Sequence, residues 1–144
     1  MKIVKWSVLL AGLMLIGPGL QTAAGEDSDQ CRQLTSPVTG EQRKYSAVAD
    51  IDGGSAYPDI ACAVYWRNNE LCAIELSSFQ FTAKVFDYHS GDEVLMTDAH
   101  YVVAAPGHPH PLAFASREEA GEFRDRAGGG ELLDYQELIA YPFD

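Results

Sequence analysis

The chain has 144 residues, and its 21 aspartates and glutamates outnumber its 10 lysines and arginines, so the formal net charge is −11 at pH 7. This acidic balance argues against nucleic acid or an anionic membrane surface as a partner, because phosphate contacts need a basic face. The length is enough for one compact domain with a modest hydrophobic core.

The first 25 residues have the pattern of an export signal. Lys2 and Lys5 precede an apolar run over residues 6–16, and small residues suited to cleavage follow it. The run is too short, and too broken by a Gly-Pro-Gly segment, to span a bilayer comfortably. We therefore predict that residues 1–25 are a cleavable signal peptide. The mature protein is then periplasmic or secreted, with no membrane anchor after cleavage.

Residues 26–43 are polar and are predicted to form a flexible lead-in to a folded domain over residues 44–144. Alternating apolar residues predict a first strand over 45–51, and Asp52-Gly53-Gly54 predicts a tight turn after it. A helix is predicted over 58–69. Proline suits its first position, aspartate suits the positive helix end, and an Asn-Asn pair is a stop signal.

The segment 79–88 is rich in aromatic and β-branched residues and alternates, with Phe79 and Phe81 on one face. This pattern predicts a strand. Two shorter strands are predicted over 93–97 and 100–104, and the proline-rich residues that follow them are expected to be extended.

Ser116 and Glu119 match a capping box, which predicts the start of a second helix. Three glycines, 128–130, end this helix, and a strand is predicted over 131–135. The order strand, turn, helix, strand thus occurs twice. It predicts an α+β fold of two similar modules in one compact domain.

The four histidines, His89, His100, His108 and His110, fall within one window of the chain. His108 and His110 each precede a proline, which favours extended backbone, and extended residues two apart face the same side. The two imidazoles could therefore meet one ion, and imidazole suits copper and zinc. The alternative is a stiff surface loop whose histidines are solvated.

The sulfur-containing residues are Met96, the only methionine after the signal, and three cysteines, Cys31, Cys62 and Cys72. A thioether favours Cu(I), although one methionine in a strand is more often core packing. At least one of the three cysteines must lie outside an intramolecular disulfide, and the sequence leaves their pairing open. Cys62 and Cys72 can pair only if the intervening helix stops between them.

The sequence contains no GxSxG elbow, no HExxH motif and no phosphate-binding glycine loop. The acidic residues are numerous, but no pair among them stands out as catalytic. We therefore expect a protein that is not an enzyme.

From Tyr45 to Glu137 the chain resembles the NosL family, exported accessory proteins of nitrous oxide reductase that bind Cu(I). The similar stretches are YSAVADIDGG, YPDIACAVYW, FTAKVFDYHSGDEVLMTDAHYVVA, LAFASREEAGEF and GGGELLDYQEL. The resemblance implies a two-module α+β fold. It also implies delivery of copper to the metal centre of an exported copper enzyme, or to its assembly factors.

The chain departs from the family pattern at the residues that would hold the metal. The usual Cys-Gly-Met segment is replaced near Thr35-Ser36-Pro37, with Cys31 upstream, and the lipid-attachment cysteine is absent. Where the family has a methionine, this chain has His108-Pro109-His110-Pro111.

Two hypotheses follow from these departures. In the first, a metallochaperone binds copper at His108 and His110, with Met96 or Cys31. The resemblance favours Cu(I), while the histidines also suit Cu(II) or zinc. In the second, the metal is lost and the domain is a binding or assembly module of an exported redox system. A weaker third idea is thiol redox chemistry at Cys31, which adjoins Arg32.

Overall fold

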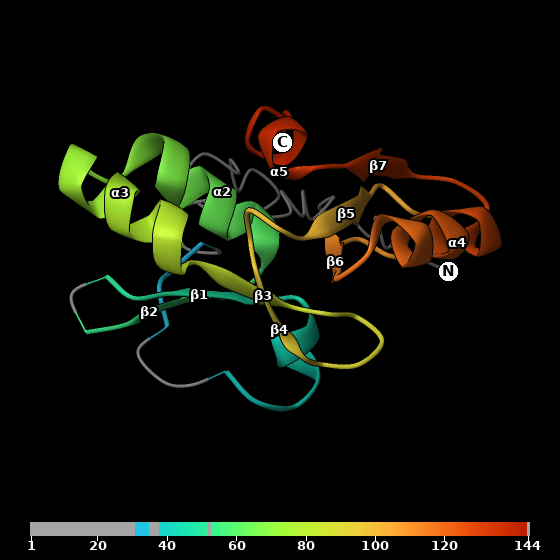
Figure 1. Ribbon diagram of the computed structural model, residues 1–144, viewed down its shortest axis with the longest axis horizontal. Coiled ribbons are helices and arrows are strands. Elements are labelled where there is room, and N and C mark those ends of the chain that lie inside the picture. The colour runs from blue at the N-terminus through green and yellow to red at the C-terminus, as the bar shows by residue number, and fades with distance from the viewer. Residues whose placement is uncertain (1–30, 35–37, 52, 144) are drawn as a thin grey trace, which may run out of the picture.

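The computed structural model describes residues 31–34, 38–51 and 53–143, which form two antiparallel sheets flanked by helices (Figure 1). This arrangement confirms the predicted α+β class. The predicted signal peptide lies outside the described residues, as does part of the predicted lead-in.

The first sheet has four strands in the order β2-β1-β3-β4, and every pair is antiparallel. Gly53 and Gly54 lie in the turn between β1 and β2, where a turn was predicted. The strand bounds are β1 (Ala47–Ala49), β2 (Ser55–Tyr57), β3 (Lys84–Phe86) and β4 (Glu93–Leu95).

The second sheet has three strands, β5 (His100–Val103), β6 (Leu112–Phe114) and β7 (Glu131–Leu133), in the order β6-β5-β7. Its order matches β2-β1-β3 of the first sheet. In each sheet the first strand is central and pairs antiparallel with the next strand and with the strand that follows the helical segment. The predicted pair of similar modules is thus present in the topology.

The two predicted helices begin and end close to the expected signals, but Asp59 is the N-cap of α2, so Pro58 precedes this helix instead of taking its first position. Asp59 accepts a hydrogen bond from the Cys62 amide (2.7 Å), and Ser116 accepts one from the Glu119 amide (3.1 Å). Gly128 adopts a φ of 87° at the end of α4, which suits glycine. The helix bounds are η1 (Gly40–Lys44, a 3₁₀ helix), α2 (Ile60–Asn69), α3 (Ala73–Thr82), α4 (Arg117–Ala127) and α5 (Tyr135–Ile139).

The strand predicted over 79–88 is wrong in its first half, because α3 extends to Thr82 and β3 covers only 84–86. Residues two apart lie about 200° apart around a helix, not on one face. Phe79 is accordingly fully buried, while Phe81 is 74% exposed. A capping box between Cys72 and Glu75 begins this helix.

Four further elements lie outside the predicted set, namely η1, β2, β6 and α5. The strand β6 follows the proline-rich loop, and α5 occupies a place where the strand over 131–135 was expected to continue. That strand ends at Leu133 because Asp134 accepts a hydrogen bond from the Glu137 amide (2.8 Å) and caps α5.

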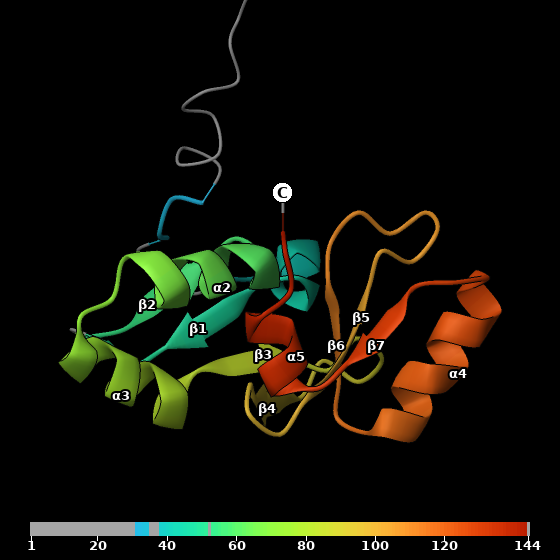
Figure 2. The same ribbon diagram turned by 90° about the horizontal axis from the view of Figure 1, so that it is seen from above.

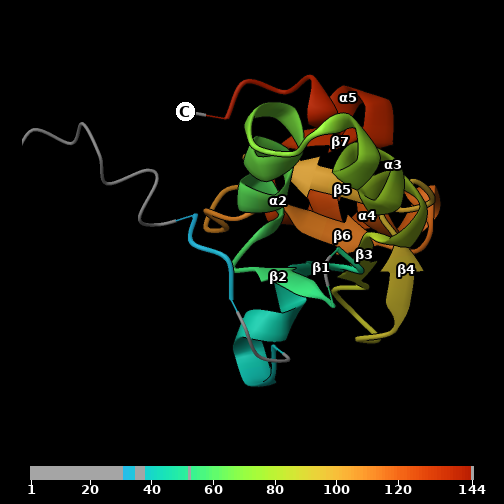
Figure 3. The same cartoon turned by 90° about the vertical axis from the view of Figure 1, so that its left-hand side faces the viewer.

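The second sheet is covered on both faces. Tyr101 and Val103 point into a core shared by both modules, whereas Val102 points into a smaller core beneath α4. Figure 2 shows α4 at the far end of the molecule and α5 beside α2, and Figure 3 shows α2 and α3 over the first sheet.

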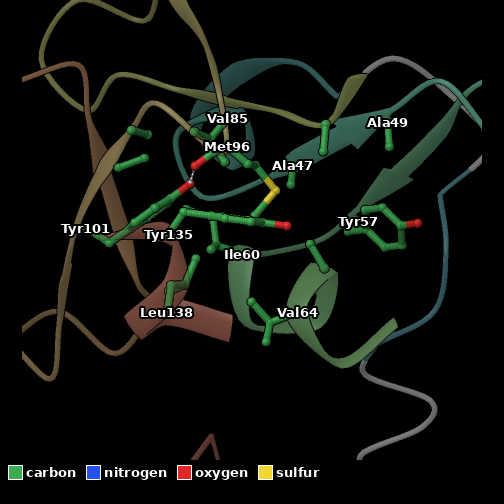
Figure 4. Close-up of a cluster of buried hydrophobic side chains, with 14 of the residues drawn as sticks. Ala47, Ala49, Tyr57, Ile60, Val64, Val85, Met96, Tyr101, Tyr135 and Leu138 are labelled. Atoms are coloured by element: carbon green, nitrogen blue, oxygen red, sulfur yellow. Dashed lines mark hydrogen bonds between the residues drawn. The ribbon is translucent and has the colours of Figure 1, made fainter. Parts of the chain in front are cut away.

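The shared core joins the two modules. Figure 4 shows that Ala47 and Val85 of the first sheet and Tyr101 and Leu138 of the second module all contribute to this core. The Tyr101 hydroxyl donates a hydrogen bond to the Met96 carbonyl oxygen (2.6 Å), drawn as a dashed line in that view.

Candidate functional site

Two histidines lie against one group of aromatic rings, formed by Tyr88, Phe114 and Phe123 and called here the aromatic cluster. The centre of the His108 ring lies 5.1 Å from that of Phe123 and 6.2 Å from that of Tyr88. The His89 ring lies 5.4 Å from Phe114 and 6.3 Å from Phe123. Imidazoles from two separate loops therefore flank the same aromatic surface.

The loop that carries His108 turns sharply instead of staying extended. The His108 amide donates to the Ala105 carbonyl (3.0 Å), and Gly107 between them has a φ of 78°. With Pro106 before the glycine, this is the pattern of a type II turn. The turn directs the chain back toward α4, where Phe123 is located.

The loop that carries His89 is fixed by a buried carboxylate. Asp87 is only 2% exposed, and it accepts hydrogen bonds from the amides of His89 (2.9 Å), Ser90 (2.8 Å) and Ala115 (2.7 Å). Burial alone would raise the pKa of Asp87, but the bonds from these amides outweigh it and lower the pKa. Asp87 thus connects the His89 turn to the segment just after β6.

His110 has different neighbours. Its Nδ1 lies 3.1 Å from Oδ2 of Asp59, the N-cap of α2, and its ring is tilted by 42° to that of Tyr45, with the ring centres 5.1 Å apart. The two histidines of the His-Pro-His-Pro segment therefore contact separate groups, His108 the aromatic cluster and His110 the end of α2.

The two predicted sulfur ligands are engaged elsewhere. Met96 is 1% exposed and packs in the shared core. Cys31 forms a disulfide with Cys62, the pairing that the sequence left open, so its sulfur is not a thiolate in this state. Cys72 is an exposed free thiol at the N-cap of α3.

His89 belongs to the predicted histidine window but was not singled out as a ligand. The sequence could show only that it follows a strand. The amide of Tyr88, its neighbour, donates to the Ala113 carbonyl (2.8 Å), and this contact between the modules brings the two loops together. His100 lies on β5, with its Nδ1 atom buried.

Within the described part of the chain, no group of three or more histidine, cysteine or acidic side chains is placed to hold a metal ion. The candidate site considered below consists of the His89 and His108 imidazoles and the aromatic cluster that both contact. Among the same residues, no helix is both long and apolar enough to cross a membrane.

Comparison of the chain with protein-family models, with curated proteins and with solved structures finds no match. The function is therefore inferred from the chemistry of the side chains themselves.

Proposed function

We propose that this protein is an exported copper-binding accessory protein, a metallochaperone that binds copper at His89 and His108. It passes the metal to an exported copper enzyme or to the assembly factors of that enzyme. The observation that carries the proposal is the placement of both imidazoles against the Tyr88 and Phe123 rings. The proposed copper site therefore pairs His108 with His89 and not with His110, because His110 contacts Asp59.

The chemistry of this pair suits a carrier of copper. Imidazole nitrogen is a good ligand for copper, and aromatic faces attract cations through their quadrupoles. Two protein ligands leave the remaining positions of the ion open to a second protein. The net charge of −11 also favours the approach of a cation.

Two further observations support an exported protein of this type. The Cys31–Cys62 disulfide is compatible with an oxidising compartment. The resemblance to the NosL family places a methionine where this chain has His108-Pro109-His110-Pro111, so imidazoles stand where a thioether ligand is expected.

The proposal is tested by titrating oxidised protein with Cu(I) and Cu(II) against colorimetric chelators. We expect a His89→Ala/His108→Ala double variant to lose affinity by at least about tenfold, in line with the loss of metal-site groups. His110→Ala is the matched control, since it removes a nearby surface histidine, and its affinity should be unchanged. A double variant that stays folded by circular dichroism and binds copper like the wild type would refute the proposal.

A second candidate, a non-metal assembly module, is favoured by the outer face of α3. Ile74 and Phe81 are 83% and 74% exposed, and with Ser77 and Ser78 they line a shallow hollow. Large apolar side chains exposed together indicate a contact surface for another protein. In this case the wild-type protein would bind no copper, and an Ile74→Ser/Phe81→Ser variant would lose its complex with the exported enzyme, as measured by co-purification.

A further inference from the structure

The Cys31–Cys62 disulfide connects the segment before the domain to the first turn of α2. The Cα atoms of the two cysteines are 4.9 Å apart. Cys62 is buried, whereas Cys31 is partly exposed. The disulfide thus lies at the edge of the shared core, at the start of α2 and outside the histidine site.

Residues 31–34, called here the strap, are also held without the disulfide. The Trp66 indole N–H donates to the Cys31 carbonyl, and the Leu34 amide donates to the Ala56 carbonyl (2.8 Å). The Gln33 side-chain Nε2 donates to the Tyr57 hydroxyl (3.4 Å). These bonds keep Cys31 beside Cys62 when the bond between the sulfur atoms is broken.

We propose that reduction of this disulfide creates a second copper site, in which the thiolates of Cys31 and Cys62 bind one Cu(I) ion. The choice of copper rests on the proposed function; the pair of thiols does not. Thiolate is the protein ligand that best suits Cu(I), and the oxidised form offers no thiolate at this place. The sulfur site is therefore open only in reduced protein, whereas the histidine site is open in both forms.

The reaction requires a dithiol reductant. The dithiol gives two electrons and two protons to the Cys31–Cys62 bond, which becomes two thiols, and the dithiol closes to its own disulfide. Binding of Cu(I) then forms two Cu–S bonds and releases the two thiol protons to water.

The local geometry favours this step. Metal–sulfur bonds are about 2.3 Å long, so two sulfur atoms on one ion are at most about 4.6 Å apart. Side chains whose Cα atoms are 4.9 Å apart can meet this requirement without backbone movement. Cys62 also lies in the first turn of α2, where the positive end of the helix favours a thiolate.

The test uses full-length mature protein in two states, oxidised, and reduced with dithiothreitol that is then removed by gel filtration without oxygen. Each is titrated with Cu(I) against a colorimetric chelator. We expect reduced protein to bind one more Cu(I) per chain than oxidised protein. Cys31→Ser and Cys62→Ser should lose this gain, and Cys72→Ser, the matched control, should keep it. Equal binding in both states would overturn the proposal.

A measurement on wild-type protein makes the test independent of whether the variants fold. Reduced protein is alkylated with iodoacetamide with and without Cu(I), and the labelled peptides are identified by mass spectrometry. Protection of Cys31 and Cys62, with Cys72 still labelled, supports the site; labelling of all three with Cu(I) bound refutes it. The His89→Ala/His108→Ala variant should keep the gain on reduction, so failure of the histidine site and failure of this site are distinguishable.

Discussion

Asp59 has two separate roles, one for each carboxylate oxygen. Oδ1 accepts the Cys62 amide and caps α2, while Oδ2 faces Nδ1 of His110 in the second module. Because the cap satisfies a helix amide, we expect Asp59→Ala to lower the free energy of unfolding by about 1 kcal/mol. Asp59→Asn keeps a capping oxygen and should lose much less. Urea unfolding of both variants checks this, and equal losses would show that the His110 contact dominates.

Asp87 is a buried carboxylate whose protonation affects the stability of the fold. Its pKa is lowered in the folded state, so its contribution is present above the unfolded pKa of about 4 and is lost as the pH falls through the folded pKa. Asp87→Asn should cost about 1.5–3 kcal/mol at pH 7, because hydrogen bonds to a charged group are lost. It should also flatten the acid side of the stability curve.

The measurement for Asp87 is the free energy of unfolding as a function of pH, from urea titrations. Asp98→Asn serves as the control, since Asp98 is an exposed carboxylate in the connection between β4 and β5. A wild-type curve as flat as that of Asp87→Asn would contradict the assignment. Asp87→Asn should also weaken copper binding, because Asp87 fixes the turn that carries His89.

At the scale of elements, the different burial of Phe79 and Phe81 distinguishes the helix α3 from the strand that the composition of this segment suggests. In a strand, Phe79 and Phe81 would share one environment, but in this helix Phe79 is buried and Phe81 is exposed. We expect Phe79→Ala to destabilise the protein by about 3–5 kcal/mol. Phe81→Ala should change stability by less than about 0.5 kcal/mol. Thermal unfolding of the two variants gives the answer, and similar losses would be incompatible with α3.

Local signals were sufficient where one residue determines the backbone. The cap Ser116 and the stop at Gly128 were predicted because each acts within one turn of its own helix, whereas Asp59 was predicted only as an acid near the helix start and is the N-cap of α2. The strand prediction over α3 failed because aromatic and β-branched residues suit both a strand and a partly buried helix. The strand β6, Leu112–Phe114, is apolar and buried at every position, so no alternation marks it as a strand.

The histidine segment was found in the sequence, but its geometry was not. The prolines beside His108 and His110 suggested extended backbone, whereas the chain turns at Gly107 and the two histidines contact separate groups. The pairing of His108 with His89 depends on contacts between modules, such as that of Tyr88 with Ala113, which have no local signal. The Cys31–Cys62 pairing likewise depends on where the strap lies in the fold, which has no local signal in the sequence.

At the scale of the whole molecule, the disulfide is the only covalent cross-link within the described residues. It joins positions 31 residues apart, and closing a loop of this length restricts the unfolded chain. We expect a Cys31→Ala/Cys62→Ala variant to be about 3–4 kcal/mol less stable than oxidised wild type. Thermal unfolding checks this, with Cys72→Ser as the control that should unfold like the wild type.

The two modules each complete their own sheet, yet they share one core to which Val85 and Tyr101 both contribute. In either module alone, the apolar face that the other module covers would be exposed to water. A chain cut in the connection between β4 and β5, near the exposed Thr97 and Asp98, would therefore give two fragments that fold only on each other. Such fragments would reassemble as a heterodimer, with the shared core as its interface.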